Sequence, residues 1–235
     1  MPAPNTTRWI GIGLLGLPLY GVLTLWSSLE GQPDPDTQLR AWARFVTTNG
    51  YVWGHLLGSI LGLIFVIFGV FALGVYLATS RAPRLGLWAM VITVLGSALF
   101  LPLQGIATFA APEEGQAVLA GIEEYESLPP IFANTIQALV GLVVILLGFV
   151  GNILAGVAVW RSETLPKWAG GLWAGAHVLM YLSLINGQTI GPASTPFTVP
   201  LGAAVVVISG AWMAWSALSR SSTAVVGVGT QPRVQ

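Results

Sequence analysis

The chain contains no cysteine, one lysine and little charge of either sign. Without thiols, disulfides, thiolate metal sites and cysteine nucleophiles are excluded. Charged residues make up 8% of the 235 residues, and their formal net charge is zero, which argues against a nucleic-acid partner. Hydrophobic residues make up 54%. This balance is typical of a protein whose main solvent is lipid.

Six apolar runs fill most of the chain. A hydrocarbon core about 30 Å thick requires roughly 20 apolar residues in helical form. The runs are too uniformly apolar for barrel strands, and helices satisfy their own backbone groups, as lipid requires. We therefore predict an all-α polytopic membrane protein with six transmembrane helices. They lie near Trp9–Trp26, Tyr51–Ala78, Leu87–Phe109, Ile131–Trp160, Trp168–Asn186 and Phe197–Leu218.

No polar stretch is long enough for a separate soluble domain. We expect one six-helix membrane domain over residues 1–219 and a disordered cytoplasmic tail over 220–235. Basic residues mark the cytoplasmic side of membrane proteins. Six crossings leave Arg40 and Arg44 on one side and put the other basic residues on the opposite side, so both termini are predicted to be cytoplasmic.

The two longest outer loops contain apolar residues at helical spacing. In Asp36–Val46 the stripe is Leu39, Trp42, Phe45 and Val46, with Asp36 as the expected helix cap. In Glu113–Tyr125 the stripe includes Val118, Leu119 and Ile122. We interpret both as short amphipathic helices in the outer interface, which could cover an outward-facing pocket. The alternative is a pair of loops that turn apolar residues toward lipid.

An internal repeat is visible in the apolar runs. The segment Gly69–Val75 aligns with Gly151–Val157, and each is followed by a proline, Pro83 or Pro166. The repeat units would be about 51–110 and 131–190. This pattern predicts a four-helix core built from two parallel hairpins, with the first and last crossings on its flanks.

No ionisable acid or base lies deep in a crossing. Proton pumps and ion-coupled transporters place such groups in the membrane, and intramembrane hydrolases need carboxylates or metal ligands there. A retinal protein would need a lysine in mid-helix, whereas Lys167 lies at a boundary. We therefore expect a protein that is not an enzyme and has no metal site.

The two histidines, His55 and His177, are possible tetrapyrrole ligands, because imidazole can bind haem iron or a chlorophyll magnesium. At about 1.5 Å per residue their expected depths differ by about 10 Å, which does not suit one haem between them. The simpler interpretation is a histidine hydrogen-bonded across a helix interface. A single axial ligand to a haem or chlorophyll-type pigment is the alternative.

Uncharged polar residues gather near the outer ends of the crossings. Convergent polar groups in an apolar cleft are typical of a binding site for a neutral molecule such as a quinone or a lipid. The alternative is that they cap helix ends. Asn152 lies deeper and is expected to make an interhelical hydrogen bond, and Pro102 should kink its helix. The candidate ligand-binding residues are Tyr51, Trp53, His55, Gln104, Asn134, Gln137, Asn186 and Gln188.

The segments His55–Gly58, Gly69–Gly74 and Arg161–Gly170 resemble those of a broad group of bacterial six-helix membrane proteins with no assigned activity. This resemblance implies a bacterial inner-membrane location. The four-helix core with two flanking helices is also similar to the cytochrome b561 fold. That family pairs histidines between helices, and this chain has no histidine partner for His55 or His177.

We therefore expect a non-catalytic integral membrane protein. It would bind a neutral hydrophobic ligand at an outer vestibule, act as an accessory subunit among other membrane subunits, or both. One alternative is a redox or light-harvesting subunit that binds haem or a chlorophyll-type pigment through one histidine. A second alternative is a transporter of an uncharged solute.

Overall fold

The computed structural model describes residues 4–29, 31–122, 135–186 and 197–228. These residues are almost all helical and contain no strand. The first four elements are α1 (Pro4–Gly13), α2 (Gly16–Ser27), α3 (Leu39–Val46) and α4 (Asn49–Trp53). The π-helix η1 (Gly54–Leu61) and α5 (Gly62–Leu77) continue α4 without a break. The remaining helices are α6 (Pro83–Leu119), α8 (Thr135–Ser162), α9 (Lys167–Asn186) and α10 (Thr198–Val228).

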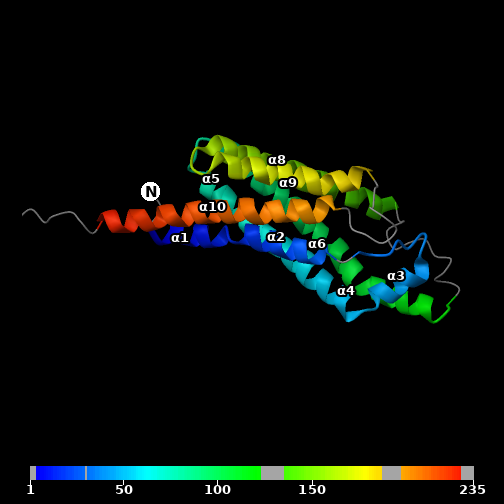
Figure 1. Ribbon diagram of the computed structural model, residues 1–235. Helices are drawn as coiled ribbons and strands as arrows, with labels where there is room; N and C mark the ends of the chain where they lie inside the picture. Colours follow the sequence, from blue (N-terminus) through cyan, green and yellow to red (C-terminus); the bar gives the residue numbers. More distant parts are fainter. Residues whose placement is uncertain (1–3, 30, 123–134, 187–196, 229–235) are drawn as a thin grey trace, which may run out of the picture.

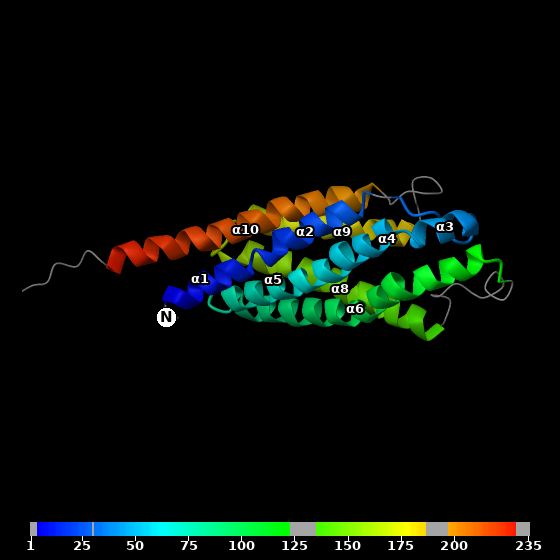
Figure 2. The ribbon, with the colours of Figure 1, turned by 90° about the horizontal axis from the view of Figure 1, so that it is seen from below.

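The helices form a closed ring in chain order (Figures 1 and 2). Each long helix packs against the one before it and the one after it, and α10 returns to pack against α1 and α2. The described ends of the chain, together with the α5–α6 and α8–α9 loops, lie at one end of the ring, here called the terminal end. Helix α3 lies at the opposite end, here called the α3 end.

Five helical stretches are long and apolar enough to cross a membrane. They are Arg8–Ser27, Asn49–Leu77, Pro83–Leu119, Ala138–Ser162 and Thr198–Arg220. This confirms the all-helical fold, and five of the predicted crossings coincide with helices that could span a membrane. Helix α9 occupies the position of the remaining predicted crossing but is not among the five.

The first crossing is interrupted between α1 and α2. Pro18 has no N–H, and its ring conflicts with the carbonyl group four residues earlier, which belongs to Leu14. The chain tightens at this point, where Leu15 N donates to Ile12 O at 3.0 Å and Leu17 N donates to Leu14 O at 3.1 Å. Both Leu14 and Leu17 are fully buried, so the interruption lies inside the packed ring.

The main hydrophobic core fills the ring toward the terminal end. Its members come from every long helix of the ring and include Leu17, Leu73, Val159, Trp173 and Met213. Helices approach closely here. A Cβ placed on Gly16 would lie 3.0 Å from the Gly69 backbone nitrogen, and one on Gly210 would lie 2.8 Å from that of Pro18. Larger residues would force these helices apart.

A second, smaller hydrophobic core joins α3 to the C-terminal part of α6. It contains Trp42, Ala43, Val46, Ala111 and Val118. The predicted helix in Asp36–Val46 is therefore confirmed, and Trp42 and Val46 of its stripe are buried. The predicted cap was wrong. Asp34, not Asp36, accepts hydrogen bonds from the Asp36 N–H and the Thr37 hydroxyl group, and α3 begins only at Leu39.

The predicted separate helix in Glu113–Tyr125 was also wrong for its described part. Helix α6 runs without interruption from Pro83 to Leu119, because neither Pro102 nor Pro112 ends it. The C-terminal half of α6 packs on α3 and is inclined to the N-terminal half of the same helix (Figure 2). Of the predicted stripe, Val118 is buried, whereas Leu119 and Ile122 are exposed. Tyr125 lies outside the described residues.

The predicted tail over 220–235 begins as helix. Helix α10 continues to Val228, beyond the predicted end at Leu218. The segment after Ser219 has no proline before Pro232, so nothing in the sequence forces the helix to end at the predicted boundary.

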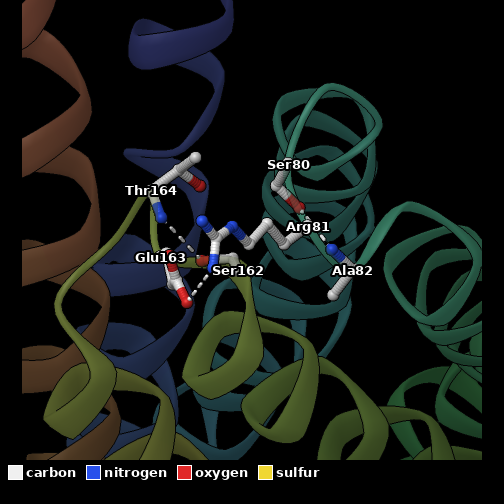
Figure 3. Close-up of polar contacts among 6 residues, drawn as sticks. All are labelled: Ser80, Arg81, Ala82, Ser162, Glu163 and Thr164. Carbon is white, nitrogen blue, oxygen red and sulfur yellow. Dashed lines mark hydrogen bonds and ion pairs between the residues drawn. The ribbon is translucent and has the colours of Figure 1, made fainter.

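The two loops at the terminal end are joined to each other (Figure 3). Arg81 Nη1 lies 2.7 Å from Glu163 Oε1, and the Arg81 N–H donates to Ser162 O at 3.4 Å. The Ser80 hydroxyl oxygen accepts from Ala82 N, and the Ser162 hydroxyl oxygen accepts from Thr164 N. Because both side chains of the ion pair are well exposed, its contribution to stability is small, at about 0–1 kcal/mol.

The junction of α3 and α6 generates a first prediction. A Cβ on Gly115 would lie 2.6 Å from Val46 Cγ2 and 2.9 Å from Ala43 O, so Gly115→Ala should lower the free energy of unfolding by about 1–3 kcal/mol. Gly105→Ala is the matched control in the same helix, because its Cβ would meet nothing within 4 Å. Thermal unfolding in detergent measures both. Equal stability of the two variants would contradict the packing of α3 on α6.

Candidate functional site

A cavity of about 440 Å³ lies in the middle of the ring, and we call it the central chamber. Helices α2, α5, α6, α8, α9 and α10 and the π-helix η1 all contribute to its wall. Most of the wall is apolar, and Leu63, Phe100, Val144 and Met180 are typical members. The polar side chains on the wall are Tyr20, Thr24, Ser27, Ser59, Gln104 and Tyr181.

Two further cavities adjoin the central chamber. The α3-side chamber has a volume of about 290 Å³ and shares Thr24, Ser27, Ser59 and Val199 with it. The deep pocket, of about 60 Å³, shares Tyr20, Leu63, Phe100, Val144 and Tyr181 with it and ends at Ser97 and Asn152. The three spaces therefore follow one another along the ring axis, from the α3 end to the edge of the main core.

The described walls of these cavities carry no charged side chain. None of the described residues that line them is Asp, Glu, Lys or Arg. The part of the chain that the structure describes also has no group of three or more side chains suited to hold a metal ion. A charged ligand would lose its hydration without gaining an opposite charge, so the chemistry of the walls favours a neutral molecule.

The π-helix η1 shapes the wall between the α3-side chamber and the central chamber. Single π-helical turns in membrane helices are often found at functional sites. Ser59 lines both chambers, and His55 lines the α3-side chamber. The segment is held against α2 at Gly58, where any Cβ would collide with the Ser27 side chain. This close approach brings Ser27 and Ser59 to the same place.

The predicted site residues separate into three groups. Gln104 lines the central chamber, and Tyr51 and His55 line the α3-side chamber. Trp53 is 56% exposed and lines none of the three cavities. Gln137 and Asn186 are helical positions in α8 and α9 whose side chains are not described, and Asn134 and Gln188 lie outside the described residues.

Sequence reasoning missed the polar face of α2. Tyr20, Thr24 and Ser27 follow one another at intervals of four and three residues, which places them on one side of a helix. All three line the central chamber. The sequence shows this spacing. Because the first crossing was expected to flank the four-helix core, its polar residues were not expected at the site.

His177 lies behind the wall of the cavities. It is fully buried, lines none of the three spaces, and stacks against Trp173, Tyr20 and Tyr181 with ring centroids 4.7, 6.4 and 6.5 Å away. Its Nδ1 donates to Trp173 O at 2.8 Å, and its Nε2 has no hydrogen-bond partner. The bond that sequence reasoning expected across the interface is instead made within its own helix.

Asn152 makes the expected interhelical hydrogen bond. Its Oδ1 accepts from Trp173 Nε1 at 3.2 Å, and its Nδ2 donates to Gly148 O at 2.8 Å. This pair joins α8 to α9 at the floor of the deep pocket. The polar lining of the cavities ends at Asn152, because its partner Trp173 already belongs to the main hydrophobic core.

Comparison with known proteins gives no match to a family model, to a curated protein or to a solved structure. The argument for function therefore depends on the geometry and chemistry of the three cavities.

The floor of the deep pocket generates a second prediction. Trp173→Phe should lower the free energy of unfolding, because it removes the indole N–H and leaves Asn152 Oδ1 without its donor. In a double-mutant cycle with Asn152→Ala, the coupling between the two side chains should be about 0.6–1.7 kcal/mol. Trp215→Phe is the control, since Trp215 is exposed. A coupling of zero would mean that the bond does not hold α8 to α9.

Proposed function

We propose that this chain is a non-catalytic integral membrane protein that binds a neutral amphiphile, a quinone or a lipid, inside its helix ring. The observation that carries the proposal is the succession of three cavities, from the α3 end to the main core, whose described lining residues carry no charge. Apolar walls with a few uncharged polar groups are typical of sites for such molecules. Beyond Asn152 the described side chains pack into the main hydrophobic core, which favours a binding pocket over a transport pathway.

The proposal includes six membrane crossings, with α9 as the sixth. Its 20 residues are about 30 Å long as a helix, which equals the hydrocarbon thickness. It packs between α8 and α10, and its outward side chains Leu172, Val178 and Leu182 are apolar and exposed. With six crossings, the bias of basic residues puts both termini in the cytoplasm of a bacterial cell and the α3 end on the outer side.

The accessory-subunit role belongs to the same proposal. The chain offers large exposed apolar side chains on several helices, including Phe68 and Phe71 of α5 and Ile208 and Trp215 of α10. Either lipid or neighbouring membrane subunits would cover these surfaces. The internal repeat gains support from the loops in Figure 3, where Ser80 and Ser162 make the same local hydrogen bond shortly before Pro83 and Pro166.

The pigment-binding alternative is supported by one observation. His177 donates from Nδ1 to a backbone carbonyl group and has a free Nε2, an arrangement that metal-binding histidines commonly show. The aromatic rings around it would have to move to admit a tetrapyrrole, because His177 lines none of the three cavities. The binding of a neutral amphiphile needs no such rearrangement and remains the preferred proposal.

Filling the central chamber tests the proposed function. Gly141 lines this chamber, and a Cβ on it would meet nothing within 4 Å, so Gly141→Leu should fold normally and project into the space. The amount of neutral quinone or lipid that co-purifies, measured by mass spectrometry, should fall at least about fivefold, because overpacking a site costs about 1–3 kcal/mol.

Gly175→Leu provides the matched control. This glycine also has nothing within 4 Å, is exposed on α9 and lines none of the three cavities. The control should retain the wild-type amount of bound amphiphile. If wild type, Gly141→Leu and Gly175→Leu carry the same amount, the chambers are not the binding site.

The orientation has its own test, which the absence of native cysteine makes simple. Thr37 and Thr79 are exposed near opposite ends of the ring. In intact cells a membrane-impermeant maleimide should label Thr37→Cys at once and Thr79→Cys only after permeabilisation, because the α3 end should face outward. The reverse labelling would place the termini outside the cytoplasm.

A further inference from the structure

Three hydroxyl groups around the α3-side chamber donate their protons to the chain itself. Ser27 Oγ donates to Thr24 O at 3.2 Å, and Ser28 Oγ donates to Leu25 O at 2.9 Å. The Tyr51 hydroxyl group donates to Ala107 O of α6 at 2.8 Å. A hydroxyl group has one donor and two acceptor sites, so each of these oxygens retains only the ability to accept.

His55 adds a further acceptor. Its Nδ1 lies 3.2 Å from Tyr51 O, and because a carbonyl oxygen can only accept, Nδ1 carries the proton in the neutral ring. The remaining nitrogen, Nε2, is then a bare acceptor. The ring is held in place by the Tyr51 side chain, with centroids 4.1 Å apart. His55 therefore brings a fixed lone pair to a chamber in which Ser27, Ser28 and Tyr51 can also only accept.

We propose that the bound amphiphile has a neutral head that carries hydroxyl donors, and that this head occupies the α3-side chamber against His55 and Ser27. This inference rests on the proposed function and deepens it. It favours a monoacylglycerol-like or quinol-like head over an oxidised quinone or a simple ester, which bring only acceptors. Thr24, Trp26, Gln32 and Ser59 also line the chamber and can donate to the oxygens of such a head. A head with acceptors alone would leave the four accepting groups above without a donor.

The apolar part of the molecule lies in the central chamber. The two spaces together extend from the level of Tyr51 to that of Leu63, which is about 18 Å along the helix axis. One leaflet of the hydrocarbon core is about 15 Å thick. The space therefore matches the depth of a single leaflet, and its volume suits one chain. A molecule with two full-length chains would not fit inside the ring.

Two lipids that differ in the head group test this inference. The probes are 1-monoolein, which has two hydroxyl groups, and methyl oleate, which has the same chain and none. Binding to the full-length protein is titrated in detergent and followed by native mass spectrometry. The wild type should bind 1-monoolein about five- to tenfold more tightly, because one or two additional hydrogen bonds form.

Variants of the acceptors show where the head lies. His55→Phe retains a ring against Tyr51 and removes Nε2, and Ser27→Ala removes one hydroxyl oxygen. Each should abolish most of the preference for 1-monoolein while leaving the affinity for methyl oleate unchanged, which also shows that the chamber is intact. Trp53→Phe is the control, because Trp53 lines no cavity, and it should retain the full preference.

The outcomes separate the two proposals. Equal affinity for both lipids in the wild type, with both lost in Gly141→Leu, would overturn the hydroxyl preference and leave the proposed function standing. An unchanged preference in both His55→Phe and Ser27→Ala would overturn the placement of the head. Binding of neither lipid, with Gly141→Leu indistinguishable from the wild type, would overturn the proposed function itself.

Discussion

Close contact between helix backbones at small residues determines the rest of this structure. Lipid supplies no hydrophobic force between helices, so packing and interhelical hydrogen bonds must hold them together. The ring is closed by such contacts, as where Gly156 meets Gly170 and Gly151 meets Thr93. Toward the α3 end the same helices carry Tyr20, Phe100 and Tyr181 on their inner faces, and these larger side chains surround a space instead of closing it.

Several polar groups in the hollow half are bonded by the chain itself. Thr108 donates to Gln104 O at 2.6 Å within α6, and the Tyr51 hydroxyl group donates to Ala107 O of the same α6 helix at 2.8 Å. An unbonded polar group in an apolar interior would cost several kcal/mol. The local bonds remove this cost but use up the donors of these hydroxyl groups. The groups bonded in this way can then only accept from a ligand.

Much of the fold could be predicted from the sequence, because the length of an apolar run determines whether it can cross a bilayer. Helix boundaries were less predictable. The amphipathic stripe around Val118 indicated a helix correctly, but not that α6 would continue into it through Pro102 and Pro112, because the predicted crossing ended at Phe109. The interruption at Leu14 follows from Pro18 and was missed, since the apolar run hides it.

The candidate site was predictable only in part. Tyr51, His55 and Gln104 stood out because polar residues are rare in the crossings. Thr24 and Ser27 of α2 did not stand out, because hydroxyl groups are common in membrane helices. They indicate a site only where another helix faces them across a cavity. Which helices face one another depends on the closure of the ring by α10, and this is a long-range contact that no local pattern encodes.

The two histidines show how far local sequence can determine a role. Each donates from Nδ1 to the carbonyl oxygen of an aromatic residue four positions earlier, Tyr51 for His55 and Trp173 for His177. The local chemistry is therefore the same, and the surroundings differ. His177 is enclosed by aromatic rings, where an unpaired Nε2 costs about 1–3 kcal/mol and packing compensates for it. His55 borders a chamber, so the corresponding nitrogen can be satisfied by a ligand, and binding would regain hydrogen-bond energy that the folded chain alone does not realise.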